Sequence, residues 1–236
     1  MKHSINSRKG LILLFLLFSL PVFIINISAK YYPDNKGNIY VHKSTEDKKI
    51  ALTFDDGPHP VKTEMILNVL RKYNVKGTFF TIGQNAERYP EVLQKVMAEG
   101  HEIANHTYDH KSIYKLNESE LQLSVRKCSK IIYEITGEEP KLFRPPEGFM
   151  NDNIARFMDS EGYNVILWKI DTYDWKGRSS EDIYQTVTTK INCGDIILMH
   201  DYIWRKSHTP EALDIIIPKL LSEGYEFFTV SELIAN

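Results

Sequence analysis

The chain has 236 residues, of which 42% are hydrophobic and 25% are charged, and its formal net charge at pH 7 is −2. This composition is typical of a globular protein, and the length gives room for one domain with a proper core. A nucleic-acid-binding protein is expected to carry an excess of basic residues, so the charge balance argues against that class of function.

The first thirty residues differ from the rest. Lys2, Arg8 and Lys9 precede an apolar run over 11–28 that contains no charged residue. A basic flank before such a run is typical of a signal peptide or of an uncleaved signal-anchor helix, and the sequence leaves this choice for residues 1–29 open. In both cases we expect the remainder to be extracytoplasmic, either anchored at the cell surface through this segment or secreted.

Residues 30–48 are polar and rich in turn formers, and we expect a linker or a short edge strand there, followed by one domain over 49–236. Apolar or β-branched runs predict strands at Ile50–Phe54, Gly77–Ile82, Glu102–Asn105, Leu142–Arg144, Val165–Ile170, Asp195–Met199 and Glu226–Val230. Helical periodicity is found between them at Val61–Tyr73, Pro90–Glu99, Glu118–Thr136, Asn151–Glu161, Ser180–Ile191 and Pro210–Ser222. This alternation indicates an α/β fold with parallel strands, and about seven strands fit either an open doubly wound sheet or a barrel.

Charged and imidazole side chains stand where five of the predicted strands end. They are Asp55 and Asp56, His106 and His110, Arg144, Asp174, and His200. Each has an ordinary explanation by itself, because adjacent acids often form turns or cap helices and histidines occur on surfaces and in cores. The carboxyl ends of parallel strands meet at one rim, however, so all five groups would converge there. This coincidence favours a functional site.

The residue types at this rim suit metal-assisted hydrolysis. His106 and His110 offer two imidazole nitrogens four residues apart, and one aspartate of the Asp55–Asp56 pair adds an oxygen. Three protein ligands leave one coordination position open, which is typical of a catalytic zinc site. A metal there would activate water and polarise a carbonyl group, and the second aspartate would act as general base.

Five motifs occur in a fixed order: TFDDG over 53–57, HTYDH over 106–110, RPPEG over 144–148, DTYDW over 171–175 and LMHD over 198–201. With this ordered set the sequence resembles the NodB-type polysaccharide deacetylases, carbohydrate esterase family 4, over roughly residues 48–235. The resemblance implies a single distorted (β/α) barrel, the NodB homology domain, with the activity of a peptidoglycan or chitin N-deacetylase.

The resemblance also implies roles for the residues of the first three motifs. Asp55 matches the catalytic base of the family. The positions of the metal ligands are matched by Asp56, His106 and His110. Arg144 matches the arginine that pairs with the base and orients it.

The last motifs match the general acid and the substrate pocket. His200 corresponds to the general acid, and Asp174 to the carboxylate that tunes it. Trp175 and Leu198 correspond to the walls of the pocket that receives the acetyl methyl group, and the backbone N–H of Glu147 would complete an oxyanion hole. Relatives often carry tyrosine at the position of Glu147, so this departure bears on the sugar subsites rather than on activity.

The implied reaction is metal-dependent hydrolysis of N-acetyl groups from GlcNAc residues of a cell-envelope polysaccharide, most of all peptidoglycan, with release of acetate. The implied cofactor is one divalent ion, with Zn²⁺ favoured and Co²⁺ as an alternative. We expect a monomer whose partner is this polysaccharide and not nucleic acid, with membrane contact only through an uncleaved N-terminal segment.

Two other functions are compatible with the same motifs. One is an esterase that removes O-acetyl groups from xylan or another acetylated glycan. The other is a non-catalytic wall-binding protein, which should have lost the base, a ligand or the acid, whereas all are present here. Cys128 and Cys193 match no zinc or redox spacing, and both a disulfide and two free thiols remain open.

Overall fold

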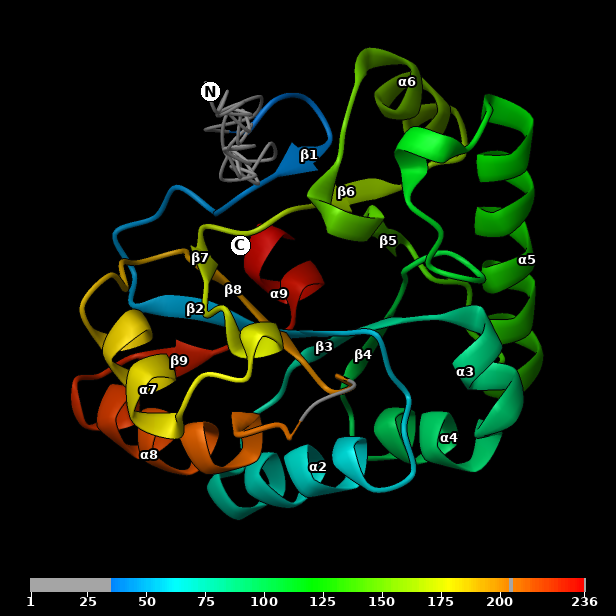
Figure 1. The fold of residues 1–236 in the computed structure, drawn as a ribbon. Coiled ribbons are helices and arrows are strands. Elements are labelled where there is room, and N and C mark those ends of the chain that lie inside the picture. The colour runs from blue at the N-terminus through cyan, green and yellow to red at the C-terminus, as the bar shows by residue number, and fades with distance from the viewer. Residues whose placement is uncertain (1–34, 204–205, 236) are drawn as a thin grey trace, which may run out of the picture.

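The computed structural model describes residues 35–203 and 206–235, so the predicted N-terminal segment over 1–29 lies outside the described residues (Figure 1). The strands are β1 (Ile39–Tyr40), β2 (Lys49–Asp55), β3 (Thr78–Thr81), β4 (Glu102–Asn105), β5 (Leu142–Phe143), β6 (Asn164–Ile166), β7 (Ile170–Asp171), β8 (Ile196–His200) and β9 (Glu226–Phe227). The α-helices are α2 (Lys62–Tyr73), α3 (Gly83–Arg88), α4 (Pro90–Ala98), α5 (Glu118–Thr136), α6 (Asp152–Ser160), α7 (Ser180–Thr188), α8 (Thr209–Ser222) and α9 (Val230–Ala235). None of these helices is long and apolar enough to cross a membrane.

The strands form a distorted barrel. They pair in parallel in the order β1-β6-β5-β4-β3-β2-β8-β7, and β9 pairs with the start of β2. Since β1 and β7 stand at the two ends of this order, the barrel is open between them, and most helices surround it (Figure 1). The expected distorted (β/α) barrel is confirmed.

One predicted strand differs from the structure, and two short helices were not predicted. The single strand predicted at Val165–Ile170 is divided, because β6 pairs with β5 whereas β7 pairs with β8 on the other side of the opening. Residues 39–40 form an edge strand beside β6, which is one of the two alternatives for the segment before the main domain. The short helices α3 and α9 were not predicted.

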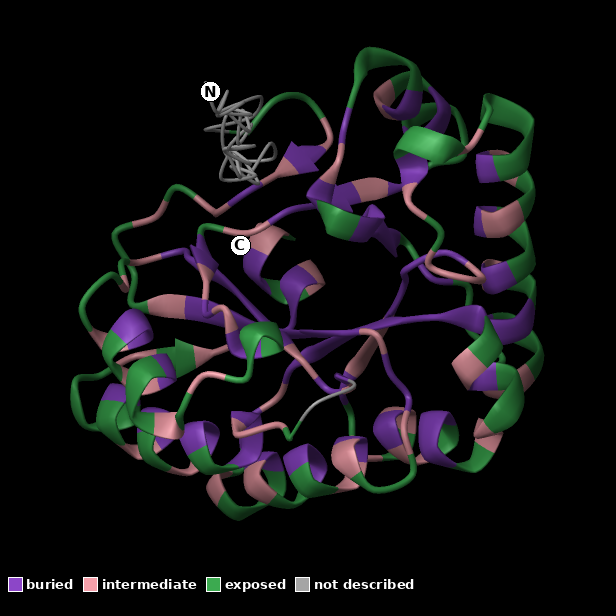
Figure 2. Ribbon diagram, in the orientation of Figure 1, coloured by how far each residue is buried: buried purple, intermediate pink, exposed green. Residues whose placement is uncertain are grey.

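Alternate residues of β2 face different surroundings. Leu52 and Phe54 pack outward against buried side chains of α2 and α8. Ala51 faces the barrel interior, in a cluster with Phe80, Ala104, Leu142, Ile166 and Ile196 of other strands. Because both faces are covered, β2 reads as an almost continuous apolar run. In Figure 2 most of β2 and of its neighbours β3 and β8 is accordingly buried, while the outer faces of the helices are exposed.

Helix α9 covers the amino end of the barrel. Its Val230 and Leu233 belong to the same inner cluster as Ala51. The N–H of Val230 donates to Oγ1 of Thr78, the first residue of β3, at 2.9 Å. The apolar inner cluster therefore ends at this helix, and polar groups line the carboxyl end of the strands.

Helix α5 shows how the sequence determines the bounds of an element. At its start, the Asn117 side chain accepts from the N–H of Glu120, and the Glu120 carboxylate accepts from the N–H of Asn117. At its end, Gly137 stops the helix with φ +77°.

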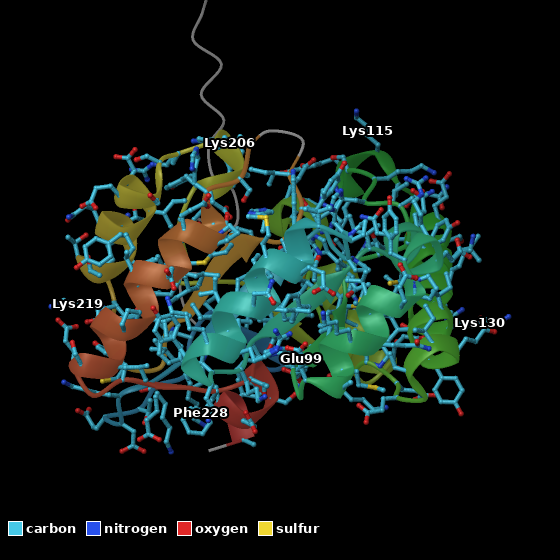
Figure 3. All side chains as sticks on the ribbon, turned by 90° about the horizontal axis from the view of Figure 1, so that it is seen from below. Glu99, Lys115, Lys130, Lys206, Lys219 and Phe228 are labelled. Atoms are coloured by element: carbon cyan, nitrogen blue, oxygen red, sulfur yellow. The ribbon has the colours of Figure 1, made fainter. Side chains whose placement is uncertain are left out.

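On the outside of the barrel, Lys130 of α5 and Lys219 of α8 extend away from the core (Figure 3).

The two cysteines are free thiols. Cys128 on α5 is buried, and its thiol lies 3.3 Å from the carbonyl oxygen of Thr81. Cys193 is only partly buried. The structure therefore contains no Cys128–Cys193 disulfide.

Candidate active site

The carboxyl end of β2 places two aspartates at the rim. Asp55 is the last residue of the strand, pairs in register with His200 of β8 and is 4% exposed. Asp56 follows with φ +79°, which turns the chain out of the strand direction. Both carboxylates therefore approach Nε2 of His106, with Oδ2 of Asp55 at 3.7 Å and Oδ1 of Asp56 at 3.5 Å.

Arg144 holds Asp55 from inside the barrel. It is fully buried, and its Nη1 donates to Oδ1 of Asp55 at 2.7 Å and to Oγ1 of Thr53 at 2.8 Å. The remaining guanidinium nitrogens donate to the carbonyl groups of Ile166 and Leu167 at 3.0 and 3.1 Å. The guanidinium thus links β2 to β6 across the interior, and Oδ2 is the Asp55 oxygen turned toward the histidines.

Asp56, His106 and His110 bring three possible metal-ligand atoms together. These atoms all lie within 4.8 Å of one another, and Oδ1 of Asp56 is 3.3 Å from Nε2 of His110. No other group of three His, Cys, Asp or Glu side chains within residues 35–203 and 206–235 has this geometry. The three ligands matched through the motifs therefore meet at one point.

The orientation of His106 suits metal binding. Its Nδ1 lies 2.8 Å from the carbonyl oxygen of Arg144. A carbonyl oxygen only accepts hydrogen bonds, so we assign the proton to Nδ1, and Nε2 faces Asp56. Metal-binding histidines are commonly fixed in this way by an acceptor on the other ring nitrogen.

The electrostatics of the triad also fit a bound cation. Oδ1 of Asp56 is buried and accepts no hydrogen bond from any described residue, which is costly for a carboxylate. Burial alone would raise the pKa of Asp56, but His106, His200 and His110 lower it below its ordinary value, so the group stays ionised. Burial opposes a charge on His106, yet Asp55 and Asp56 raise its pKa. This concentration of negative charge draws positive charge to the position between the ligands.

The Asp174–His200 pair lies on the other side of Asp55. Nδ1 of His200 and Oδ1 of Asp174 are 2.8 Å apart, and Asp174 is 1% exposed. Burial would lower the pKa of His200, but the Asp174 carboxylate and, more weakly, Asp56 and Asp55 raise it to about 10. The imidazole is therefore protonated at neutral pH and can donate a proton.

The three predicted pocket residues lie near these groups. Leu198 is buried two residues before His200 on the same face of β8, and Trp175 is 40% exposed. Glu147 turns the RPPEG segment with φ +59°, and its carboxylate accepts from Oγ of Ser112 at 3.3 Å. Burial and His106 lower the pKa of His110, while Glu147 opposes that shift, so Glu147 lies within electrostatic reach of the triad. The proposed pocket and oxyanion roles stay predictions.

Two other acids of the motifs make different contacts. Asp109 accepts a hydrogen bond from Ser124 at 3.1 Å, and Asp201 accepts one from Thr63 at 2.6 Å. Neither belongs to the triad. Both carboxylates therefore bind hydroxyl groups of neighbouring segments rather than the position between the three ligands.

Two threonines in contact with the site were not singled out from the sequence. Oγ1 of Thr53 accepts a hydrogen bond from Arg144. Thr53 lies two residues before Asp55 in the strand, so the two side chains are on the same face, and this spacing could have indicated the contact. Thr209 bonds Asp174 at 2.7 Å from the start of α8. Its distance in sequence from the motifs gave no indication of this contact.

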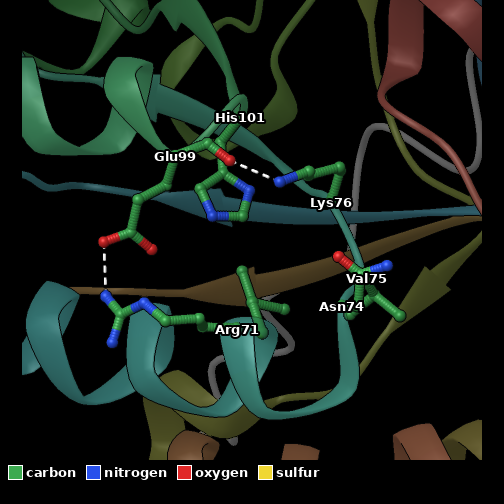
Figure 4. A pocket seen from close by; sticks show the side chains of 7 residues that line it. Arg71, Asn74, Val75, Lys76, Glu99 and His101 are labelled. Carbon is green, nitrogen blue, oxygen red and sulfur yellow. Dashed lines mark hydrogen bonds and ion pairs between the residues drawn. The ribbon is translucent and has the colours of Figure 1, made fainter.

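A separate hollow of about 220 Å³ opens at the amino end of the strands. Figure 4 shows that Glu99 binds both cations of the hollow: its carboxylate pairs with Arg71, and its backbone carbonyl oxygen accepts from Lys76. Burial, followed by Lys76, lowers the pKa of His101 to about 4, so this histidine is neutral. The hollow lies at the end of the barrel opposite the triad.

Comparison with known proteins identifies the family of this chain. The family model described as polysaccharide deacetylase matches residues 42–166. A peptidoglycan-N-acetylglucosamine deacetylase of Bacillus cereus is 41% identical over 191 residues, which cover 80% of this chain and 89% of that protein.

Solved structures of this family also resemble the chain in fold. The Bc1960 peptidoglycan N-acetylglucosamine deacetylase, in complex with 4-naphthalen-1-yl-N-oxidanyl-benzamide, superposes with a TM-score of 0.81 at 35% identity and covers 84% of this chain and 94% of that one. A family 4 acetyl xylan esterase from Clostridium thermocellum, in complex with a cobalt ion, has a TM-score of 0.73 at 34% identity and covers 79% and 90%. Sequence, fold and relatives thus agree that the chain belongs to the polysaccharide deacetylase family.

Proposed function

We propose that this protein is a metal-dependent hydrolase that removes N-acetyl groups from GlcNAc residues of a cell-envelope polysaccharide, with peptidoglycan the favoured substrate. The observation that carries this proposal is the meeting of an Asp–His–His triad, an arginine-bound aspartate and an Asp–His pair at one rim. Similarity to two deacetylases named for peptidoglycan N-acetylglucosamine supports the choice of substrate.

The metal would be held by Asp56, His106 and His110. When bound, a divalent cation lowers the pKa of water and polarises the acetyl carbonyl group. We favour zinc, because two imidazoles and one carboxylate are a common catalytic ligand set for it. Cobalt is the alternative, since the similar acetyl xylan esterase is described with a cobalt ion.

The side chains supply the proton transfers. Asp55 accepts a proton from the attacking water through Oδ2, because Arg144 binds its Oδ1. As water oxygen forms its bond to the acetyl carbon, the N–H of Glu147 stabilises the negative charge on the carbonyl oxygen. His200 then donates its proton to the nitrogen as the C–N bond breaks, which matters because an amine is a poor leaving group unless protonated. The products are acetate and a free amino sugar.

We also propose where the protein acts. The basic and apolar composition of residues 1–29 supports export of the chain, as a cleaved signal peptide or a membrane anchor. Residues 49–236 would then form the catalytic domain outside the cytoplasm. We propose that this domain works as a monomer, because every group assigned to the reaction comes from one chain.

Hydrolysis of O-acetyl esters on xylan is the second candidate. It is supported by the 34% identity to an acetyl xylan esterase over most of both chains. The same base, metal ligands and acid would serve, although an alcohol leaves more readily than an amine and needs the general acid less.

Acetate release decides between these functions. The metal-loaded protein should release acetate from cell-wall peptidoglycan and from chitin oligomers, and a chelator should stop this release. Acetylated xylan, assayed in parallel, tests the second candidate. Failure to release acetate from any GlcNAc polymer by zinc-loaded or cobalt-loaded protein would contradict the proposal.

A further inference from the structure

The Asp174 carboxylate has four hydrogen-bond donors. Oδ1 accepts from Nδ1 of His200 at 2.8 Å and from the N–H of Trp175 at 2.9 Å. Oδ2 accepts from the N–H of His200 at 2.8 Å and from Oγ1 of Thr209 at 2.7 Å. Three of these donors belong to the DTYDW and LMHD motifs, whereas Thr209 comes from the first residue of α8. The carboxylate therefore depends on one side chain outside the motifs.

The hydroxyl group of Thr209 has little freedom to turn away. Thr209 is fully buried, and its single hydroxyl proton is directed to Asp174. Its oxygen accepts a hydrogen bond from Oγ of Ser207 at 3.0 Å, and the N–H of Thr209 donates back to Ser207 at 3.3 Å. Because an ionised carboxylate only accepts, the direction of this chain from Ser207 to Thr209 to Asp174 is fixed.

The position of Thr209 adds a second favourable effect. It lies in the first turn of the 14-residue helix α8, where the helix dipole favours a negative charge. Burial would raise the pKa of Asp174, but His200 and Thr209 lower it, so the group remains a carboxylate. The acids that act on His200 are Asp174, Asp56 and Asp55, and Asp171 is also within electrostatic reach of it.

We propose that Thr209 is a positioning residue for the general acid, since its hydroxyl holds the Asp174 carboxylate in the orientation that aims His200 at the leaving nitrogen. The inference rests on the proposed function, in which His200 protonates the amine. Without the hydroxyl, Asp174 keeps three of its four donors, but Oδ2 keeps only the N–H of His200. The carboxylate is then held less firmly about its Cβ–Cγ bond, and so is the imidazole that donates to it.

Two substitutions separate this role from packing. Thr209→Val keeps the branched shape and removes the hydroxyl, whereas Thr209→Ser keeps the hydroxyl and removes a methyl group. A hydrogen bond to a charged group is worth a change of about 10-fold to 100-fold, so Thr209→Val should lower kcat for N-acetyl hydrolysis by that factor. Thr209→Ser should stay within about threefold of the wild type. Thr188→Val is the matched control, because the hydroxyl of Thr188 bonds the carbonyl of Tyr184 within α7.

The leaving group provides a readout that loss of packing would not change. Turnover of 4-nitrophenyl acetate, whose leaving group needs no proton, should change less than about twofold in Thr209→Val. Equal losses on the amide and the ester, or equal losses in Thr209→Val and Thr209→Ser, would overturn the proposal. So would wild-type turnover of the amide by Thr209→Val.

A titration of His200 distinguishes failure of this inference from failure of the proposed function. In protein labelled with ¹⁵N-histidine, the pKa of His200 measured by NMR should differ from the wild-type value in Thr209→Val and return to it in Thr209→Ser. This measurement needs no substrate. Wild-type protein that releases no acetate would contradict the proposed function, while an unchanged His200 titration in Thr209→Val would contradict the role of Thr209.

Discussion

The two ends of the barrel use charged residues in opposite ways. At the amino end, Arg71 and Lys76 are both satisfied by Glu99, one through its carboxylate and the other through its carbonyl oxygen (Figure 4). At the carboxyl end, adjacent aspartates approach the same histidine nitrogen, and Oδ1 of Asp56 is buried with no hydrogen bond from the described residues. At the amino end the Glu99 carboxylate is paired with Arg71, whereas at the carboxyl end Asp56 Oδ1 has no such partner among the described residues.

The two ends of the barrel therefore have different roles, one in the fold and the other in the reaction. In barrels of this kind the catalytic groups gather at the C-terminal face, whereas the N-terminal face serves the fold. The hollow beside Glu99 is therefore a poor candidate for the active site, although it is a cavity lined by a histidine and two cations. The unpartnered carboxylate oxygen of Asp56 marks the end of the barrel where a cation and a substrate are expected.

The largest effect on acetate release should come from removing the negative charge of Asp56, a proposed metal ligand. Asp56→Asn keeps the size of the side chain, and asparagine tolerates the φ of +79° found there. We expect the bound metal to be lost and acetate release to fall to background, because only an ionised carboxylate supplies the negative charge. Metal content by mass spectrometry and acetate release measure this. Glu99→Gln at the other end should keep both, and metal retention with full activity in Asp56→Asn would refute the assignment.

Replacing a histidine should affect turnover at the carboxyl end of the barrel but not at the amino end. His200→Ala should reduce amide turnover by roughly 10²-fold to 10⁴-fold, the usual contribution of general acid catalysis, and reduce turnover of activated esters much less. His101→Gln, at the amino end, should leave both rates unchanged. Parallel assays on a GlcNAc oligomer and on 4-nitrophenyl acetate test this, and equal losses on the two substrates would exclude His200 as the acid.

The pH dependence of amide turnover tests the role of Asp174 at the carboxyl end of the barrel. His200 must be protonated to act, and Asp174 raises its pKa, so amide turnover should fall only as the pH rises toward a value near the raised pKa of about 10. Asp174→Asn removes the negative charge and lowers the pKa of His200. The alkaline decline in kcat should therefore begin at lower pH in Asp174→Asn than in the wild type. A decline that begins at the same pH in both proteins would show that another group is responsible.

The smallest effect should follow from the paired charges. The Arg71 side chain is half exposed in its pair with Glu99, and ion pairs that solvent reaches contribute little to stability. Glu99→Gln should thus lower the unfolding midpoint by about 2 °C or less, without a change in acetate release. Thermal unfolding followed by circular dichroism checks the first value. A large destabilisation would mean that Glu99 supports more of the fold than its contacts indicate.

The sequence predicted the parts of the molecule that depend on local pattern and on the ordered motifs. The bounds of β4 and α5 agree with their predicted bounds, and the proposed metal ligands Asp56, His106 and His110 lie together. The division of Val165–Ile170 into two strands could not be predicted, because it depends on which neighbours each half finds in the barrel.

Long-range contacts of residues outside the motifs could not be predicted either. The hydrogen bond from Thr209 to Asp174 joins residues 35 positions apart, and no local pattern identifies such a pair. Helix α9 is short, and its place at the amino end is determined by the apolar cluster that it covers. Tertiary packing thus decides which residues outside the motifs support the site.

Anomalous X-ray scattering from crystals of the purified protein would test the central claim most directly. Data collected at the absorption edge of zinc or cobalt should show one peak per chain, with Oδ of Asp56 and Nε2 of both His106 and His110 at bonding distance. Protein that deacetylates glycan at full rate with no metal peak between these three residues would contradict the account.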